Sequence, residues 1–192
     1  MELKGKKIGF CFTGSFYTYK TTCDEIKRII KKGGEVIPIM SYYAYYTDSK
    51  FGKAKDFIQE IEDITGKKII YKMQEAEYVS STYELDIMII APCSGNTVAK
   101  LANSITDTPV LVAARTILKD SKPLVLAFCC KDGLSFNAEN IGKLLNRKDL
   151  FFVPFGQDNP ITKPYSICFN PKYLIKTLET ALEKRQLQPL LN

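Results

Sequence analysis

Residues 86–103 read DIMIIAPCSGNTVAKLAN, and they define the central unit of the fold. After Asp86, residues 87–91 are apolar without alternation, which is typical of a strand buried on both faces of a parallel sheet. Pro92 to Gly95 predicts a break, and Asn96 to Asn103 predicts a helix. A buried strand that leads through a polar loop into a helix is the repeating unit of an α/β protein.

The same alternation continues in both directions along the chain. Further strands are expected at residues 7–12, 35–40, 69–71, 124–128 and 150–154. Helices are expected between the loop at 13–15 and residue 32, and at residues 52–64, 75–84, 109–118, 135–146 and 171–187. This pattern predicts an α/β fold in which a mostly parallel sheet carries helices on both faces, formed as one domain over residues 1–192.

The composition narrows the chemistry, because the 192 residues include no histidine. That absence excludes Ser-His-Asp triads, Cys-His dyads and histidine-ligated zinc, and we expect no metal site. Proton transfer is left to Tyr, Cys, Lys, carboxylates, water or a bound cofactor. The 27 Lys and Arg against 21 Asp and Glu give a net charge of +6. This excess is mild and dispersed, so no nucleic-acid partner is expected.

The cysteines and the apolar runs predict the setting of the protein. Most of the six cysteines lie within apolar runs: Cys11, Cys23, Cys93, Cys129, Cys130 and Cys168. A free cysteine in such a run behaves as a small hydrophobe, and no C-x-x-C pair occurs, so we expect reduced thiols in a cytoplasmic protein. The longest apolar runs are far shorter than the ~20 residues that span a bilayer, and no signal peptide is visible, so no membrane partner is expected.

Functional residues are expected in the loops that follow the strands, because parallel sheets bind ligands at the carboxyl ends of their strands. The loops are residues 13–15, 41–49, 92–97 and 129–137. In the first, Thr13-Gly14-Ser15 suits phosphate, since glycine admits close approach and the next helix points its amides there. A tight turn with a serine cap is the alternative.

The start of the first helix decides whether that loop lies at a helix N-terminus. Thr22 and Glu25 form a capping-box pattern that would begin the helix late. We favour the earlier start, directly after Ser15.

The third loop carries three polar side chains at the start of the next helix: Ser94, Asn96 and Thr97. Helix capping needs only one such residue, so their number favours an anion or cofactor site over capping alone. In the second loop, the Ser41 hydroxyl follows a strand and is placed to reach a phosphate. The tyrosines at residues 42–46 suit an aromatic pocket, an oligomer interface or a lid, with core packing as the alternative for any one of them.

These motifs resemble the flavoprotein family, which includes FMN-containing cysteine decarboxylases and flavin prenyltransferases. The resemblance is carried by Thr13-Gly14-Ser15 with Lys20, by Ser41, and by the run Ala91 to Lys100 with Asn103 and Asp107. It implies a Rossmann-like, three-layer α/β/α fold that binds FMN and forms homo-oligomers based on trimers. By this resemblance, Ser15, Ser41, Thr97 and the Thr13–Gly14 loop hold the phosphate, Ser94 supports the flavin, and Asn96 lies near the substrate.

Two departures from the family pattern matter. The decarboxylases carry a catalytic histidine at the position of Tyr78, and tyrosine is a poor base at neutral pH because its ordinary pKa is near 10. The prenyltransferases carry an arginine after the strand at 124–128, where this chain has Lys131. Lysine can neutralise an anionic group there, but not bidentately.

Within the family, the whole chain resembles most the flavin component of a two-component sporulation oxidoreductase. That resemblance implies a dehydrogenase-like partner protein that carries NADP, and a small cyclic dicarboxylate substrate oriented by Asn96 and neutralised by Lys131. Two alternatives remain open: a stand-alone FMN-dependent decarboxylase or prenyltransferase, and a non-catalytic scaffold for the partner protein.

Overall fold

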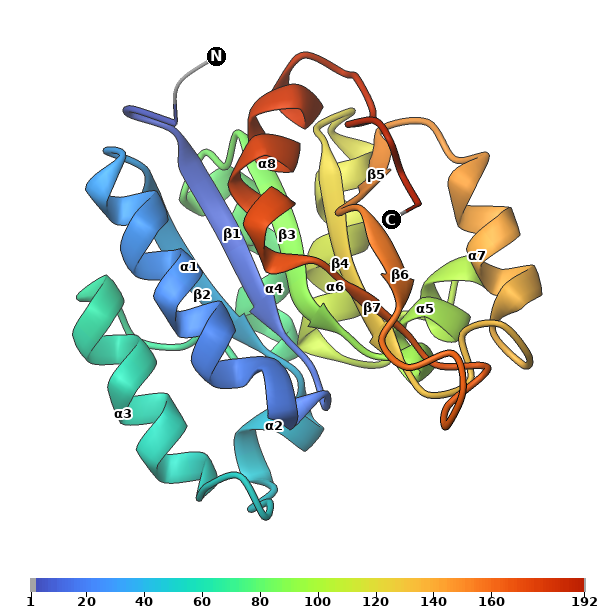
Figure 1. Cartoon of the computed structure of the whole chain (residues 1–192). Coiled ribbons are helices and arrows are strands. Elements are labelled where there is room, and N and C mark those ends of the chain that lie inside the picture. The colour runs from blue at the N-terminus through green and yellow to red at the C-terminus, as the bar shows by residue number, and fades with distance from the viewer. Residues whose placement is uncertain (1–2, 192) are drawn as a thin grey trace.

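Five parallel strands form the centre of the sheet in the computed structural model, which describes residues 3–191 (Figure 1). Their spatial order is β2, β1, β3, β4 and β5, and each neighbouring pair is parallel. The bounds are β1 Lys7–Phe12, β2 Glu35–Met40, β3 Ile87–Cys93, β4 Leu124–Cys130 and β5 Leu150–Phe152. The predicted fold class is confirmed. In this strand order successive strands are added on one side of β1 and then on the other, so a topological switch point lies between β1 and β3. Ligands usually bind at the carboxyl ends of the strands at such a point.

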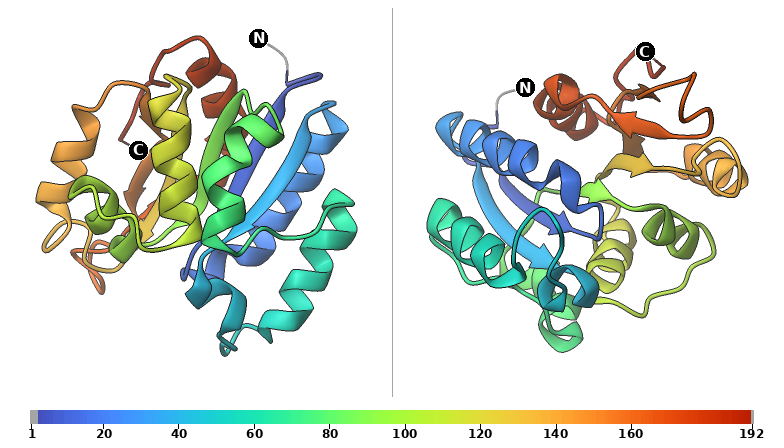
Figure 2. Two further views of the ribbon diagram at one scale, coloured as in Figure 1. Left: turned by 180° about the vertical axis from the view of Figure 1, so that it is seen from behind. Right: turned by 60° about the horizontal axis from the view of Figure 1, so that its bottom comes forward.

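Helices cover both faces of the sheet (Figure 2). One face carries α1 Tyr19–Lys31, α3 Ala54–Thr65 and α8 Leu174–Leu182, and the other carries α4 Met73–Thr82, α5 Gly95–Ala102, α6 Pro109–Lys119 and α7 Ala138–Leu145. Short pieces complete the set: η1 Phe16–Thr18, α2 Tyr42–Tyr46 and η2 Pro171–Tyr173. Each face has its own hydrophobic core.

The strand β3 shows why its sequence does not alternate. Ile87 and Ile89 pack into the core under α1 and α8, whereas Met88 and Ile90 pack into the core under α4 and α6. All seven residues of the strand are buried. The period-2 geometry of a strand is therefore present, but both sides require apolar residues.

The structure corrects the predicted break at Pro92, because β3 continues through it to Cys93. Pairing with β4 is irregular between Ile90 and Cys93, so the missing N–H of Pro92 falls where the ladder is already interrupted. The first helix starts early, as predicted: η1 follows Ser15 directly and α1 follows η1. The last helix, however, ends at Leu182 rather than at residue 187.

A short antiparallel extension was not predicted. The strands β6 Phe155–Gln157 and β7 Ile167–Phe169 pair with each other, and β7 pairs with the carboxyl half of β4. The amino half of β4 pairs with β5 on the same edge. The sequence in this region is rich in turns, and strands of three residues carry too little periodicity to identify.

Single bridges lie along the outer strands. Ile70 pairs with Ile39 on the outside of β2, so the strand predicted at 69–71 is reduced to one residue pair. Leu191 pairs with Phe155 beside β6 in the same way. The outer strands β2 and β6 therefore each have one residue of another segment paired along their open side.

The extension also overturns the prediction that the cysteines are all reduced. Cys129 of β4 and Cys168 of β7 form a disulfide. They are directly opposite each other in the antiparallel ladder, a pairing that depends on the unpredicted strand β7. Cys11, Cys23, Cys93 and Cys130 are free thiols. Within residues 3–191, no helix combines the length and the apolar character needed to cross a bilayer.

Candidate functional site

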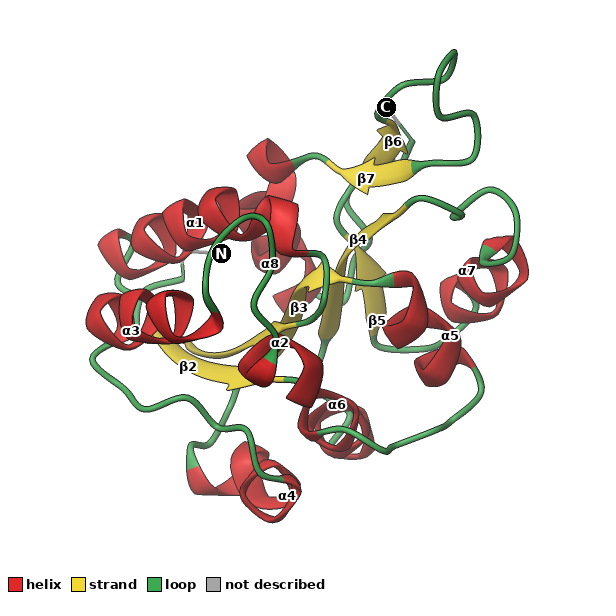
Figure 3. Ribbon diagram, turned by 90° about the horizontal axis from the view of Figure 1, so that it is seen from below, coloured by secondary structure: helices red, strands yellow, loops and turns green. Residues whose placement is uncertain are grey.

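A cleft of about 530 Å³ opens at the carboxyl edge of the sheet. Figure 3 looks at this edge, where the strands end beside the starts of α2, α5 and α6. The cleft lies between the ends of β1, β2 and β3 and the starts of α2, α5 and α6. Its lining residues are Thr13, Gly14, Ser41, Tyr42, Tyr43, Ser94, Asn96, Thr97, Lys100, Asp107, Thr108 and Leu111. The volume falls within the ~300–1,000 Å³ typical of small-molecule sites.

The cleft brings together most of the predicted site residues. Its lining includes Thr13, Gly14, Ser41, Ser94, Asn96 and Thr97. Ser15 and Lys131 are outside the lining. Thr108, the N-cap of α6, and Leu111 in its first turn also line the cleft, and neither was predicted from the sequence. Their signal in the sequence was a threonine N-cap followed by Pro109.

Thr13 joins the two strands on either side of the topological switch point. Its hydroxyl donates to the Pro92 carbonyl oxygen at 2.7 Å and accepts from the Ser94 N–H at 2.9 Å. The side chain is buried, so these bonds replace hydration that it has lost. Thr13 therefore fixes the spacing between the β1 and β3 loops, and its hydroxyl is already used within the protein.

Gly14 leaves its backbone open to the cleft. An added Cβ would lie 2.7 Å from Cδ1 of Tyr43, closer than real Cβ contacts allow. Within residues 3–191, no protein acceptor is found for the N–H groups of Gly14 and Ser15. Backbone donors without partners beside a helical turn form an anion-binding arrangement.

Ser41 and Ser94 are both N-caps whose hydroxyl groups face the cleft. Ser41 Oγ accepts from the Ala44 N–H at 3.3 Å and caps α2. Ser94 Oγ accepts from the Thr97 N–H at 3.4 Å and lies 2.9 Å from Thr97 Oγ1. Ser41 only accepts from the backbone, so its hydroxyl hydrogen is free to donate to a ligand oxygen, and the Ser94–Thr97 pair uses one of its two hydroxyl hydrogens internally and leaves the other for a ligand. Capping and ligand binding are therefore compatible here.

Asn96 and an ion pair form the mouth of the cleft. The Asn96 side chain is exposed, and no hydrogen bond ties it to other residues in the described part of the chain. Lys100 Nζ lies 2.7 Å from Asp107 Oδ2, so its charge is neutralised locally. An anion in the cleft would therefore meet hydroxyl and amide donors, because the lysine in the lining is already paired.

Ser15 and Lys131 differ from the other predicted residues. The Ser15 hydroxyl donates to the Cys129 carbonyl oxygen at 3.1 Å, so a phosphate contact would require that bond to break. Lys131 is exposed on the loop after β4. Neither position was evident from the sequence, because both depend on how β4 ends beside the β1 loop.

A polar cluster supports the start of α5 from behind. Asn137 Nδ2 donates to Asp132 Oδ1 at 3.3 Å, and the Cys130 thiol donates to the same carboxylate oxygen. Burial, with this bond, raises the pKa of Cys130 to about 11, so the thiol stays protonated at neutral pH. A Cβ on Gly95 would collide with Cys130 Sγ, so the cluster requires glycine at that position.

Tyr78 lies away from the cleft. It is exposed on α4 and lines a different groove with Arg115, Thr116 and Lys119 of α6. The residue at the histidine position of the decarboxylases therefore does not face the cleft of its own chain.

A parallel α/β sheet with a polar cleft at its switch point is typical of a nucleotide-binding class of protein, and comparison with known families identifies which one. The chain belongs to the Flavoprotein family, whose model matches residues 1–170. It is 41% identical over 190 residues to the B subunit of dipicolinate synthase from Bacillus subtilis strain 168, covering 99% of this chain and 95% of that protein.

Solved structures agree with this assignment. The crystal structure of the dipicolinate synthase B subunit from Bacillus halodurans matches with a TM-score of 0.91 at 39% identity, covering 100% of this chain and 98% of that one. A dodecameric FMN-dependent Ubix-like decarboxylase from Escherichia coli O157:H7 matches with a TM-score of 0.63 at 23% identity, covering 77% and 79%. The second match shows a shared fold.

Proposed function

We propose that the cleft binds FMN and that the chain acts as the flavin component of a dipicolinate synthase. The observation that carries the proposal is the convergence of partner-free amides at Gly14 with the hydroxyl groups of Ser41, Ser94 and Thr97 in one cleft. Membership of the Flavoprotein family and similarity to the dipicolinate synthase of Bacillus subtilis support the same proposal.

The residues of the cleft fit the parts of FMN. Its phosphate is expected near Gly14, Ser41 and Thr97, where neutral donors and the N-terminus of α5 favour an anion. Ser94 supports the flavin, and Tyr42 and Tyr43 provide an apolar wall. When bound, FMN supplies a flat two-electron redox group. The chain itself binds and orients the flavin and shields it from water.

The substrate side of the proposal uses Asn96 and Lys131. Asn96 has a free amide at the mouth of the cleft, which suits a carboxylate or ring nitrogen of a cyclic dicarboxylate. Lys131, on the exposed loop after β4, provides a positive charge for the second carboxylate. A dehydrogenase-like partner protein with NADP would accept the electrons when a dihydrodipicolinate-level precursor becomes dipicolinate.

A direct test of the cofactor is the visible spectrum of the purified chain. We expect the absorption bands of bound flavin, or FMN binding after addition, seen as quenching of flavin fluorescence. A colourless chain that leaves the fluorescence of added FMN unchanged would refute the cofactor proposal.

Asn96 tests the substrate role. We expect Asn96→Ala to keep FMN bound and to lower dipicolinate formation with the dehydrogenase-like partner by at least about tenfold, the loss of one well-placed hydrogen bond of ~1.5 kcal/mol. Unchanged formation would contradict the role. Equal rates with and without FMN would instead favour the scaffold alternative.

The stand-alone alternatives make different products. Release of carbon dioxide from a cysteinyl substrate would indicate a decarboxylase, and a prenylated flavin in the purified protein would indicate a prenyltransferase. The position of Tyr78 outside the cleft gives no support to the first. A homo-oligomer based on trimers, expected from the family, is tested by the mass of the purified protein in solution.

A further inference from the structure

We propose that the Cys129–Cys168 pair is a reversible redox site that controls the conformation of the Ser15–Tyr17 segment, and through it the affinity of the cleft. The control of affinity rests on the proposed function, whereas the control of conformation does not. The disulfide joins β4 to β7 at the end of β4 that faces the β1 loop.

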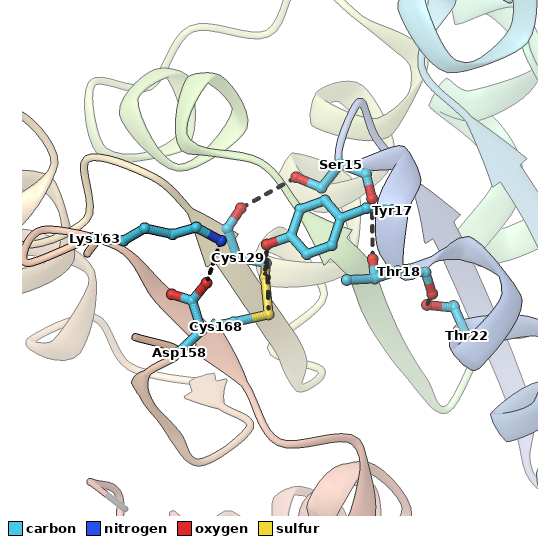
Figure 4. Close-up of a disulfide and its surroundings, with 8 residues drawn as sticks. All are labelled: Ser15, Tyr17, Thr18, Thr22, Cys129, Asp158, Lys163 and Cys168. Carbon is cyan, nitrogen blue, oxygen red and sulfur yellow. Dashed lines mark hydrogen bonds and ion pairs between the residues drawn. A yellow bond between two sulfur atoms is a disulfide. The ribbon is translucent and has the colours of Figure 1, made fainter. Parts of the chain in front are cut away.

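The disulfide touches the β1 loop directly (Figure 4). The Tyr17 hydroxyl lies 2.6 Å from Cys129 Sγ and 3.7 Å from Cys168 Sγ. Disulfide sulfurs carry no hydrogen, so Tyr17 is the donor. The Ser15 hydroxyl donates to the carbonyl oxygen of the same Cys129. Two contacts therefore hold residues 15–17 against one half of the disulfide.

Reduction must disturb the contact of Tyr17 with the sulfurs. The sulfurs of a disulfide are ~2 Å apart, and two thiols cannot remain that close because each carries a hydrogen and a full van der Waals radius. Tyr17 lies against both sulfurs, so their separation displaces its hydroxyl. Tyr17 is three residues from Gly14, which lines the cleft. Residues 15–17 therefore connect the sulfurs directly to the loop where the phosphate is expected to bind.

The two sulfurs differ in solvent exposure, and this difference determines which one a reducing thiolate attacks first. Cys129 is 1% exposed, whereas Cys168 is partly exposed. A small thiolate such as glutathione therefore attacks Cys168 Sγ, the protein disulfide breaks, and Cys129 leaves as a thiolate that takes a proton. A second glutathione thiolate attacks the glutathione sulfur of the mixed disulfide and releases Cys168. The two electrons come from two glutathione molecules, which become one glutathione disulfide.

The first measurement is the number of reactive thiols after denaturation. The chain has six cysteines. With the pair intact, alkylation labels the four free thiols, and after reduction it labels all six. We expect labelling to move between these values as the ratio of reduced to oxidised glutathione changes. Six labelled cysteines after incubation with oxidised glutathione would overturn the proposal.

The second measurement is amide exchange by NMR, which needs no flavin. The Thr18 N–H is bonded to the Ser15 carbonyl oxygen at 3.2 Å, and the Tyr19 N–H to that of Phe16. We expect these two amides to exchange about fivefold faster after reduction, the effect of losing ~1 kcal/mol of local stability. Equal exchange in both redox states would overturn the proposal.

Three variants separate the pair from its surroundings. Cys168→Ser should show the faster amide exchange of the reduced state with reduced and with oxidised glutathione alike. Tyr17→Phe should keep the disulfide, by thiol count, but lose most of the difference in exchange. Cys23→Ala, which removes a thiol on α1 away from the pair, should respond as the wild type does. If Tyr17→Phe showed the same difference in amide exchange between the two redox states as the wild type, the proposed role of Tyr17 would be overturned. This test holds even if Cys168→Ser does not fold.

FMN titration in both states then tests the consequence for the cleft. We expect about tenfold weaker binding after reduction, the cost of ordering one or two side chains again on binding. Equal affinity in both states would overturn the control of affinity. Absence of FMN binding in both states, with a difference in exchange, would support the redox site and overturn the flavin function.

Discussion

Gly14 lies where the ring of Tyr43 covers the end of β1, and the backbone is exposed to the cleft at that point. We expect Gly14→Ala to lower FMN affinity by at least about tenfold, because the new methyl group displaces Tyr43 or keeps the phosphate from the backbone. The free energy of unfolding should fall by less than about 1 kcal/mol, since the exposed ring can turn aside. Flavin fluorescence and urea unfolding measure the two effects.

A matched glycine provides the control. Gly142 lies inside α7, and a Cβ added there meets nothing within 4 Å. Gly142→Ala should raise the free energy of unfolding by about 0.5–1 kcal/mol through the backbone entropy of the unfolded chain and leave FMN affinity unchanged. If both variants lose FMN equally, close approach at Gly14 is not the reason.

At this scale the sequence predicted which residues gather but not how each is used. Ser41 and Ser94 follow strands directly, Thr97 lies in the first turn of the helix that comes next, and parallel strands bring their ends to one edge. Thr13 lines the cleft as predicted from its loop, but the sequence did not reveal that its hydroxyl bridges Pro92 and Ser94. The direction of one hydroxyl depends on atoms from a strand about eighty residues away, which local pattern does not contain.

At the scale of the element, α1 carries a buried thiol that makes stability depend on pH. Burial raises the pKa of Cys23 from 9.0 to about 12 in the folded chain. The folded state therefore holds this proton more tightly, so the contribution is complete below pH 9 and is lost as pH rises toward 12. Between pH 8 and 10 it should lower the free energy of unfolding by about 1.4 kcal/mol.

Cys23→Ala measures that contribution because the other ionisable groups remain. Urea unfolding at pH 8 and pH 10 should show a smaller loss in the variant than in the wild type, by roughly 1 kcal/mol. Equal losses would show that the buried thiol is not held protonated.

The elements differ in how far the sequence defines them. The bounds of β1 and β2 were predicted without error, because each is an apolar run flanked by clear turn residues. The hairpin of β6 and β7 was missed, and with it the disulfide, because its strands are three residues long and one pairs with the distant β4. Local periodicity identifies strands that are long and buried, and long-range pairing determines the short ones.

At the scale of the molecule, both cores share the same strands. The side chains of β1 and β3 alternate between the two cores, so neither face can lose its packing while the other remains intact. We expect one cooperative transition in urea, with coincident midpoints for far-UV circular dichroism and tyrosine fluorescence, as for a single domain. Separate midpoints would indicate two independent units.

The bridges at Ile70 and Leu191 have a consequence for behaviour at high concentration. An open edge strand is a template on which another chain can add, and the outer strands β2 and β6 are such edges. Here a segment of the same chain already occupies hydrogen-bonding groups on each: Ile70 bonds to Pro38 and Met40, and Leu190 to Phe155. At these positions the chain's own loop and tail already occupy the edges of β2 and β6, so fewer backbone groups are left for a second chain to pair with when the protein is concentrated.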